Sequence, residues 1–359
     1  MATTEAPTAV DGDKLMEFVF QAVGEVGATL NTAMVVMGDK LGLYRAMAGA
    51  GPLTPVELAR RTGASERYVR EWLNTQAAGG YVTYDAADST YTLPPEQAVA
   101  LTDESSPAYL PGFFQLALGS VTDSPRIVES ARSGEGVGWH EHNHDVFDGC
   151  ERFFRPGYAA NLLSAWLPAL DDVVEKLERG AKVADLGCGH GSSTILMAQA
   201  YPSSTFLGSD YHAGSIETAR ERAAAAGLSD RIRFEAASAA DTPGEAYDLV
   251  TMFDCLHDMG DPVGAAKHVR GLIADDGTWM VVEPKAGDRV EDNLNPVGRA
   301  YYGFSTLLCT PASLSQEVGL ALGAQAGPAR IRDVVSAAGF TRFRIAAETP
   351  FNNVFEVRP

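Results

Sequence analysis

The sequence predicts an α/β chain, in which a mostly parallel sheet with helices on its faces follows a smaller and mainly helical domain. Two observations support this prediction. From about residue 171 onward, short apolar runs alternate with helical runs, as in chains that build a parallel sheet. Before residue 105, apolar residues instead recur every three or four positions, which indicates helices. At 359 residues the chain is long enough for two domains.

Composition and charge narrow the class of protein further. The formal net charge of −19 argues against nucleic acid or an anionic membrane as the main partner, because both attract a positive surface. The four cysteines form no C-x-x-C pair, which predicts reduced thiols, a cytoplasmic location and no zinc ribbon. No run of 18 apolar residues occurs, so no membrane span is expected. We predict a disordered tail (1–13), a helical domain (14–105), linker helices that cover a pocket (106–170), and a catalytic domain (171–359) with an insert (285–327).

An apolar stripe runs along residues 14–48. Leu15, Phe18, Val19 and Ala22 begin a rhythm of i, i+3, i+4 and i+7 that continues to Met37. A helix this apolar needs a partner, which could be its own domain or a second subunit. We expect that this helix packs partly on a second subunit.

The next segment predicts a helix-turn-helix followed by a hairpin. Thr54, Pro55 and Glu57 form a capping-box start, and a second helix is expected over residues 66–78. Two short strands, 81–84 and 90–93, complete a winged-helix pattern. Such a domain could bind DNA or mediate dimerisation, and the acidic chain favours dimerisation. The segment resembles the N-terminal domain of small-molecule O-methyltransferases, which implies a homodimer and a role in closing the substrate pocket.

Residues 183–193 read as a buried strand, a glycine turn and a helix start. Gly187, Gly189 and Gly191 permit a tight turn, after which free backbone N–H groups can approach a ligand. Asp185 lies inside the strand end, and Asp210 ends the next apolar strand, where it can accept both hydroxyls of a ribose. The G-x-G-x-G spacing differs from the dinucleotide fingerprint, so a NAD site or a turn without a ligand is the less favoured alternative.

This arrangement resembles the S-adenosylmethionine (SAM) site of class I methyltransferases. The resemblance implies a Rossmann-like sheet of seven strands with the last one antiparallel, which the helix end at Gly339-Phe340 and two closing strands also suggest. It places Asp185 near the methionine part of the cofactor, Asp210 on the ribose and Ser238-Ala239 beside the adenine. The acid common near Ser238 is shifted here to Asp241, which weakens the adenine assignment. The expected cofactor-binding residues are Asp185, Gly187, Gly189, Gly191, Asp210, Tyr211, Ser238, Ala239, Asp254 and Tyr158.

Three residues are candidates for the chemistry. His257 and Asp258 follow the fourth predicted strand, and Glu283 ends the fifth. A histidine there can remove a proton from an acceptor near neutral pH, although a buried capping role is the alternative. Small-molecule O-methyltransferases carry a His-Asp pair at this position, which implies that His257 is the general base and that an acid such as Glu283 orients it. Glu283 could otherwise cap a loop or bind substrate.

The acceptor pocket is less specific. Trp139, His140, His142, Asn295, Arg299 and Tyr302 are the candidate substrate contacts. His140, His142 and His144 alternate, so they could share a face and bind a metal, line a pocket mouth, or lie on the surface. No metal ligand is assigned from the sequence.

The sequence therefore predicts SAM-dependent methylation of a small molecule, most simply at oxygen. A metal-assisted C-methyltransferase that uses His257, Asp258 and one of the three alternating histidines is a second possibility. A SAM-sensing DNA-binding regulator is a third. The pattern does not identify the acceptor.

Overall fold

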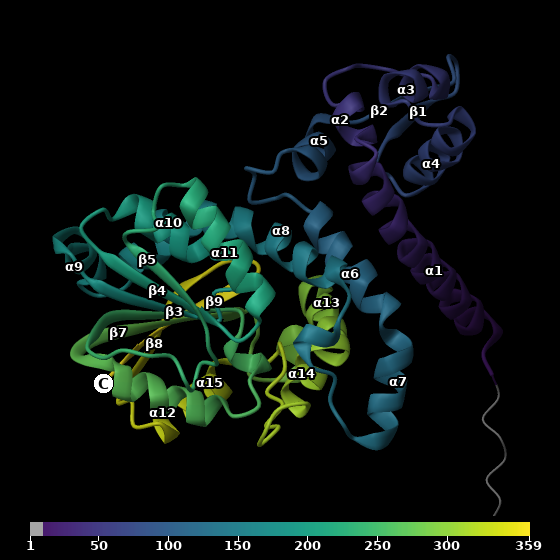
Figure 1. Cartoon of the computed structure of the whole chain (residues 1–359). Helices are drawn as coiled ribbons and strands as arrows, with labels where there is room; N and C mark the ends of the chain where they lie inside the picture. Colours follow the sequence, from purple (N-terminus) through teal and green to yellow (C-terminus); the bar gives the residue numbers. More distant parts are fainter. Residues whose placement is uncertain (1–9) are drawn as a thin grey trace, which may run out of the picture. The chain divides into compact units, whose positions relative to one another are not determined.

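The computed structural model describes residues 10–359, which divide into two compact units (Figure 1). The first unit contains the chain up to Asp103 together with Tyr109–Gln115, and the second contains Glu104–Ala108 and Leu116–Pro359. Most of the predicted tail, residues 1–9, lies outside the described part. Residues 12 and 13 are helical, because the Asp11 side chain accepts hydrogen bonds from the free N–H groups of the first turn.

The first unit is the winged helix that the sequence predicts. Its elements are α1 (Gly12–Lys40), α2 (Leu43–Met47), α3 (Pro55–Thr62), α4 (Glu66–Ala78), β1 (Thr83–Asp85), β2 (Thr90–Thr92) and α5 (Pro95–Thr102). The start of α3 shows the expected capping box: Thr54 Oγ1 accepts from Glu57 N, and Glu57 Oε2 accepts from Thr54 N at 2.8 Å.

Helix α1 is buried only near its C-terminal end. There Trp72 of α4 donates its indole N–H to Met34 O at 2.8 Å, and Asn31 accepts from Gln76 at 2.8 Å. The preceding turns expose large apolar side chains, with Phe18 and Phe20 65% and 69% exposed. By length and composition α1 is apolar enough to cross a membrane, but one such helix near an N-terminus is weak evidence for that.

The second unit is an α/β domain. Its sheet consists of β3 (Lys182–Leu186), β4 (Thr205–Asp210), β5 (Ile232–Ala236), β6 (Tyr247–Phe253), β7 (Ile273–Pro284), β8 (Arg342–Glu348) and β9 (Asn352–Arg358). The helices named below are α7 (Ser124–Ser133), α8 (His144–Asn161), α9 (Val173–Arg179), α10 (Ser192–Ala200), α11 (Ala213–Ala225), α12 (Pro262–Leu272), α13 (Pro296–Phe304), α14 (Thr310–Leu314) and α15 (Pro328–Ala337). Helix α6 (Pro111–Thr122) begins in the first unit and continues into the second.

The seven strands run in the order β5-β4-β3-β6-β7-β9-β8. β3 pairs in parallel with β4 and β6, and β9 pairs antiparallel with both of its neighbours. The expected seven-stranded sheet with an antiparallel last strand is therefore confirmed. The chain reverses strand order around β3, so a crevice is expected at the carboxyl ends of β3, β4 and β6.

Two apolar layers hold the sheet between helices. Alternate side chains of a strand point to opposite faces, so Val183 packs with α10 and α11 while Ala184 packs with α12 and α15. Figure 1 shows α10 and α11 on one side of the sheet and α12 and α15 on the other. This burial on both faces explains why the strands read as continuous apolar runs.

Candidate functional site

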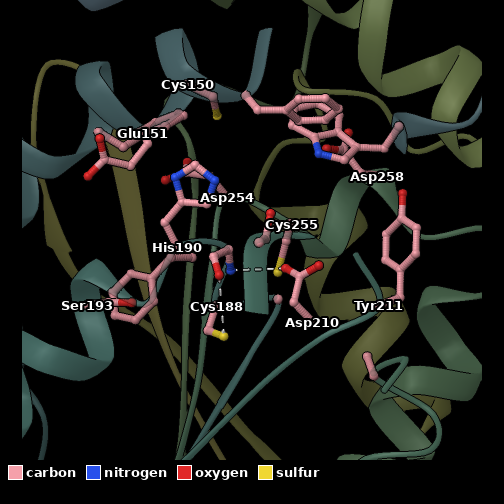
Figure 2. Close-up of a pocket in the computed structure, with 18 of the residues that line it drawn as sticks. Cys150, Glu151, Cys188, His190, Ser193, Asp210, Tyr211, Asp254, Cys255 and Asp258 are labelled. Atoms are coloured by element: carbon pink, nitrogen blue, oxygen red, sulfur yellow. Dashed lines mark hydrogen bonds between the residues drawn. The ribbon is translucent and has the colours of Figure 1, made fainter. Parts of the chain in front are cut away.

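A cavity of 440 Å³ opens where the carboxyl ends of the central strands meet α8 and the glycine turn (Figure 2). Its lining comes from segments more than 170 residues apart in the chain. The lining residues are Trp139, Phe147, Cys150, Glu151, Phe154, Arg155, Tyr158, Gly187, Cys188, Gly189, His190, Ser192, Ser193, Asp210, Tyr211, Ser215, Ala237, Ser238, Ala239, Phe253, Asp254, Cys255, Asp258, Met259, Ala312 and Gln316.

The glycine turn brings bare backbone to this cavity. Gly187, Gly189 and Gly191 all have positive φ, which only glycine adopts without strain. A side chain at Gly187 would also collide with Cys255 Sγ, at 2.6 Å from the added Cβ. Gly187 and Gly189 line the cavity, whereas Gly191 packs on Phe234 behind it.

Asp185 lies beneath the turn and does not line the cavity. Its carboxylate is fully buried and accepts hydrogen bonds from the hydroxyls of Ser193, Thr194 and Thr251 at 2.7, 2.6 and 2.8 Å. Burial raises the pKa of Asp185, while the three hydroxyls oppose that rise. The structure therefore shows Asp185 joining β3, α10 and β6, in a place where the sequence led us to expect a cofactor contact.

Asp210 points into the cavity, as expected. Its Oδ2 accepts from Gly189 N at 3.0 Å (Figure 2), and its Oδ1 accepts from His212 N at 2.9 Å. A carboxylate can accept about four hydrogen bonds, so two sites remain for a ligand. Tyr211 lines the cavity beside it and is half exposed, and Ser238 and Ala239 line the cavity nearby.

Asp254 is held in an unusual backbone conformation at the end of β6. Its φ of 51° is left-handed, a state that costs free energy for a residue with a Cβ and is common at functional sites. The Tyr158 hydroxyl donates to Oδ2 at 3.0 Å and Asn352 donates to Oδ1 at 2.9 Å. Burial, together with the charge of Glu283, raises the pKa of Asp254 to about 8.

His257 lies behind the cavity wall in a buried cluster. Its Nδ1 is 2.5 Å from Glu283 Oε2, and its Nε2 is 3.2 Å from Asp258 Oδ1. Asp258 lines the cavity, whereas His257 and Glu283 do not and are 3% and 1% exposed. Burial disfavours the charged ring, but Asp258 and Glu283 outweigh this and hold the pKa of His257 well above its usual range.

The expected acceptor contacts divide into two groups. Trp139 lines the cavity. Asn295, Arg299 and Tyr302 lie in or next to α13 outside the cavity lining, where the Asn295 side chain caps the helix by accepting from Gly298 N.

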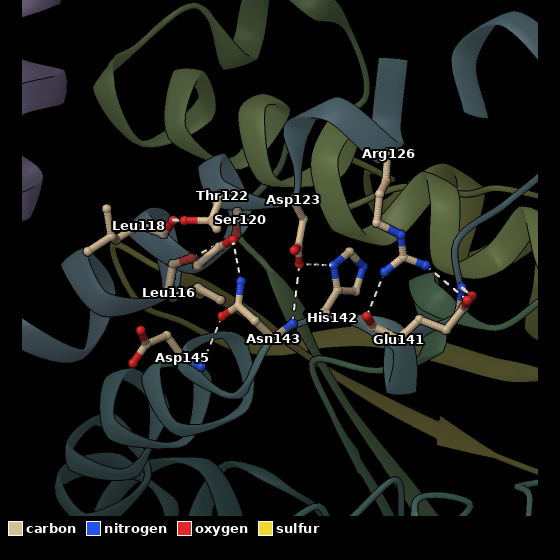
Figure 3. A network of polar contacts seen from close by, with 12 residues as sticks. Leu116, Leu118, Ser120, Thr122, Asp123, Arg126, Glu141, His142, Asn143 and Asp145 are labelled. Atoms are coloured by element: carbon tan, nitrogen blue, oxygen red, sulfur yellow. Dashed lines mark hydrogen bonds and ion pairs between the residues drawn. The ribbon is translucent and has the colours of Figure 1, made fainter. Parts of the chain in front are cut away.

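The three alternating histidines do not share a face. His140 lies in a 3-10 turn and packs edge-on against Tyr211. His142 is buried, with Nδ1 2.8 Å from Asp123 Oδ2 (Figure 3). His144 begins α8 and packs against Phe147. The turn breaks the extended geometry on which the three-histidine metal site depended.

The network in Figure 3 anchors residues 141–143, which follow Trp139 closely in the chain. Asp123 also accepts from Asn143 N, and the Asn143 amide donates to Gly119 O at 2.9 Å. Arg126 binds both the backbone oxygen and the carboxylate of Glu141. These bonds fix the segment that leads into α8 and with it one wall of the cavity.

Helix α8 supplies most of the lining that the sequence reasoning missed. Phe147, Cys150, Glu151 and Arg155 recur every three or four residues, so they share one face of the helix, and none of them was assigned to a site from the sequence. Glu151 accepts from Ser192 at 3.0 Å, and Arg222 pairs with it at 2.8 Å. No short-range pattern marks this link between α8 and the glycine turn.

Two family models match the chain. Residues 29–103 match an "Rv2258c-like winged HTH domain", and residues 177–315 match a "Methyltransferase domain". These are the two domains that the structure separates. The chain therefore matches a winged helix-turn-helix domain in its first unit and a methyltransferase domain in its second.

Curated relatives that match parts of the chain include methyltransferases. An uncharacterised Synechococcus protein is 37% identical over 84 residues, or 23% of this chain and 20% of that protein. A trans-aconitate 2-methyltransferase from Paracidovorax citrulli is 40% identical over 108 residues, or 30% of this chain and 40% of that enzyme. A mitomycin biosynthesis 6-O-methyltransferase from Streptomyces lavendulae is 26% identical over 250 residues, covering 67% of this chain and 70% of that enzyme. The chain thus spans less than half of the first two.

Solved structures share the whole fold. A putative O-methyltransferase from Nostoc punctiforme superposes with a TM-score of 0.72 at 20% identity, covering 98% of this chain and all of the other. Human N-acetylserotonin methyltransferase, solved in complex with SAM, gives a TM-score of 0.68 at 17% identity and covers 99% of each chain. At these identities the likeness establishes the fold.

Proposed function

We propose that the chain transfers the methyl group of SAM to an oxygen atom of a small-molecule acceptor. The observation that carries the proposal is that one cavity joins the glycine turn and Asp210 to Asp258, which is in contact with His257. The expected donor site and Asp258, which contacts the candidate proton acceptor His257, therefore line the same cavity.

The cofactor side of the cavity fits SAM. The positive-φ glycines leave room for a ligand against the backbone, and Asp210 has acceptor sites free for the two ribose hydroxyls. Asp254 and Tyr158 would hold the cationic amino-acid end, because an ionised Asp254 attracts an ammonium group. Ser238 and Ala239 would border the adenine. Bound SAM supplies a methyl group already activated by its sulfonium.

In the proposed reaction, residues of the chain position the acceptor and accept its proton. In our proposal the acceptor hydroxyl lies next to Asp258, and its proton passes to Nε2 of His257 through that carboxylate or after a small shift of it. Because Asp258 and Glu283 raise the pKa of His257, this step requires a pH high enough for the ring to be neutral. Glu283 accepts from Nδ1, which fixes the ring and stabilises its charged form. Positioning in a closed cavity supplies much of the rate for a bimolecular transfer of this kind.

The proposed partner is a second copy of the chain. The exposed apolar side chains of α1, among them Phe18, Phe20 and Val23, form a surface that a second copy would cover. Cytoplasmic location remains a prediction from composition.

Helix α4 presents little unpaired positive charge that could bind DNA. Arg67 pairs with Glu71 and Arg70 pairs with Glu66, so both arginines of the would-be recognition helix are neutralised within the helix. In the proposed function, nucleic acid is therefore not a partner, and neither is a membrane.

The test uses SAM with a labelled methyl group and a panel of phenols, hydroxy acids and keto acids. We expect label in one class of hydroxyl compound, with S-adenosylhomocysteine formed in equal amount, and NMR of the product should place the methyl on oxygen. A methyl on carbon would overturn O-methylation. Failure of calorimetry to detect SAM binding would overturn the enzyme proposal, and a specific DNA gel shift at physiological salt would favour the regulator.

A further inference from the structure

We propose that His257, Asp258 and Cys309 together form a binding site for a thiophilic divalent transition-metal ion of the zinc type. A nitrogen, an oxygen and a sulfur ligand atom, one from each residue, all lie within 4.8 Å of one another. Among residues 10–359 this is the one group of three or more such side chains that meets this spacing.

The backbone brings the three ligands together from two segments. His257 and Asp258 lie in a short 3-10 turn (Leu256–Asp258) after β6. Cys309 ends a π-helical turn (Ser305–Cys309) between α13 and α14. Single π-helical turns are uncommon and often occur at functional sites. Cys309 is 7% exposed, and its sulfur lies close to the ligand atoms of His257 and Asp258.

Glu283 prepares the histidine for a metal. Its Oε2 binds His257 Nδ1 at 2.5 Å, and its Oε1 accepts from Leu256 N at 3.1 Å, so the ring is held at one edge. The free edge, Nε2, then faces Asp258 and Cys309. A carboxylate on the far nitrogen of a metal-binding histidine is the usual supporting contact in zinc sites.

The charges around the cluster favour a cation. Asp258 Oδ1 is buried and has no hydrogen-bond partner in the described part of the chain, although it lies 3.2 Å from Nε2. Asp254, Asp258 and Glu283 crowd one histidine, and their negative charges repel one another in a buried place. A divalent ion would satisfy the unpaired oxygen and offset this excess of negative charge.

The ligand set selects the kind of ion. Imidazole, carboxylate and thiolate together suit Zn²⁺, whereas Mg²⁺ and Ca²⁺ prefer oxygen alone. Three protein ligands leave one tetrahedral position open, and Asp258 places the cluster at the cavity wall. Binding requires Cys309 as thiolate and Nε2 of His257 without a proton, so the protons on these two atoms are released to solvent when the ion enters.

The site has a consequence that rests on the proposed function. Nε2 of His257 cannot hold a metal ion and accept a proton at the same time. An ion in this cluster would therefore inhibit methyl transfer by occupying the base, while SAM would still bind at Asp210.

The test is a titration of the metal-free full chain with Zn²⁺ in competition with a chromophoric chelator. We expect one ion per chain and no response to Mg²⁺. Cys309→Ser should weaken Zn²⁺ binding by about 10–100-fold or more, and Asp258→Asn should do the same. The matched control is Cys150→Ser, which removes a half-buried thiol that lines the cavity outside the cluster and should leave the affinity unchanged.

Two further measurements keep the result independent of folding and of the enzyme assay. Circular dichroism and SAM calorimetry check that each variant is folded. Co²⁺ should give a thiolate charge-transfer band in the native chain that Cys309→Ser abolishes. No Zn²⁺ binding by the folded native chain, or equal loss in Cys150→Ser, overturns the metal site and leaves the methyl-transfer proposal untouched. Metal binding by a chain that transfers no methyl group would overturn only the methyl-transfer proposal.

Discussion

Nδ1 of His257 lies 2.5 Å from Oε2 of Glu283, although 26 residues separate them in the chain. The contact exists because β6 and β7 are parallel neighbours and both residues follow the apolar core of their strands. Glu283 thus leaves only Nε2 of the ring for chemistry, on the side of Asp258. This relationship underlies the first prediction.

Replacing His257 by Ala should lower kcat by about 10²–10⁴-fold, because the acceptor loses its proton acceptor in the transition state. SAM affinity should stay the same, because His257 does not line the cavity. Steady-state kinetics and calorimetry measure the two effects. His268→Gln is the matched control, since that ring binds Thr242 O outside the cavity and its loss should leave kcat unchanged. Normal turnover in His257→Ala would rule out the general base.

Replacing Asp210 by Ala should weaken SAM binding by about 10–100-fold, the equivalent of one or two charge-assisted hydrogen bonds to the ribose. Calorimetry measures the dissociation constant directly. Asp275→Ala, which removes an exposed carboxylate on β7 away from the cavity, should have no effect. An unchanged dissociation constant in Asp210→Ala would remove this residue from the cofactor site.

Replacing Asp185 by Ala should lower the free energy of unfolding. The hydroxyls of Ser193, Thr194 and Thr251 lose their shared acceptor in the core, at a cost of about 3 kcal/mol in the free energy of unfolding. Urea unfolding measures this cost. Asp210→Ala serves as the comparison, because it should lower cofactor affinity with little change in stability. If Asp185→Ala and the native protein unfold at the same urea concentration, Asp185 does not hold these elements together.

SAM affinity should depend on pH through Asp254. Burial raises the pKa of this carboxyl from 3.8 to about 8, so below that pH the free protein holds its proton. A bound cation favours the ionised form, so binding should release a proton and tighten as the pH rises toward 8, then level off. Calorimetry in two buffers with different ionisation enthalpies counts the released protons. Asp254→Asn should bind with no such slope, and an identical slope in both proteins would contradict the assignment.

Charged substitutions on α1 should dissociate the proposed dimer. Phe18→Asp combined with Phe20→Asp places two charges on the exposed apolar surface, which a second copy could not bury without cost. Light scattering should show a native dimer and a monomeric variant with unchanged circular dichroism. Val128→Asp, an exposed apolar position on α7, is the control. A native monomer, or recruitment of the native chain to lipid vesicles, would contradict a dimer through α1.

Local signals in the sequence predicted the backbone features around the cavity. The strand-turn-helix at 183–193, the place of Asp210 at a strand end and the capping box at Thr54 depend on residues close together in the chain, whose backbone preferences act at short range. The same holds for the two domains, because a helical period and a strand alternation are visible in any window of a dozen residues.

Contacts between distant segments could not be read in the same way. Asp185 faces the core because hydroxyl groups of α10 and β6 donate hydrogen bonds to it there. The sequence of β3 does not show where these hydroxyls lie. The face of α8 that lines the cavity and the approach of Cys309 to His257 depend on how whole helices pack. The alternating histidines failed as a set because residues 139–141 fold into a 3-10 turn, which rotates their side chains apart.

The sequence by itself therefore determined the two-domain architecture, the glycine turn and the acids around it, because these follow from backbone preference and from burial along one segment. Only the tertiary structure decided which acid faces the cofactor cavity, that His257 lies behind Asp258, and that a thiol from a remote turn completes the cluster. Those outcomes depend on packing between segments up to about 170 residues apart, for which no local pattern carries the information.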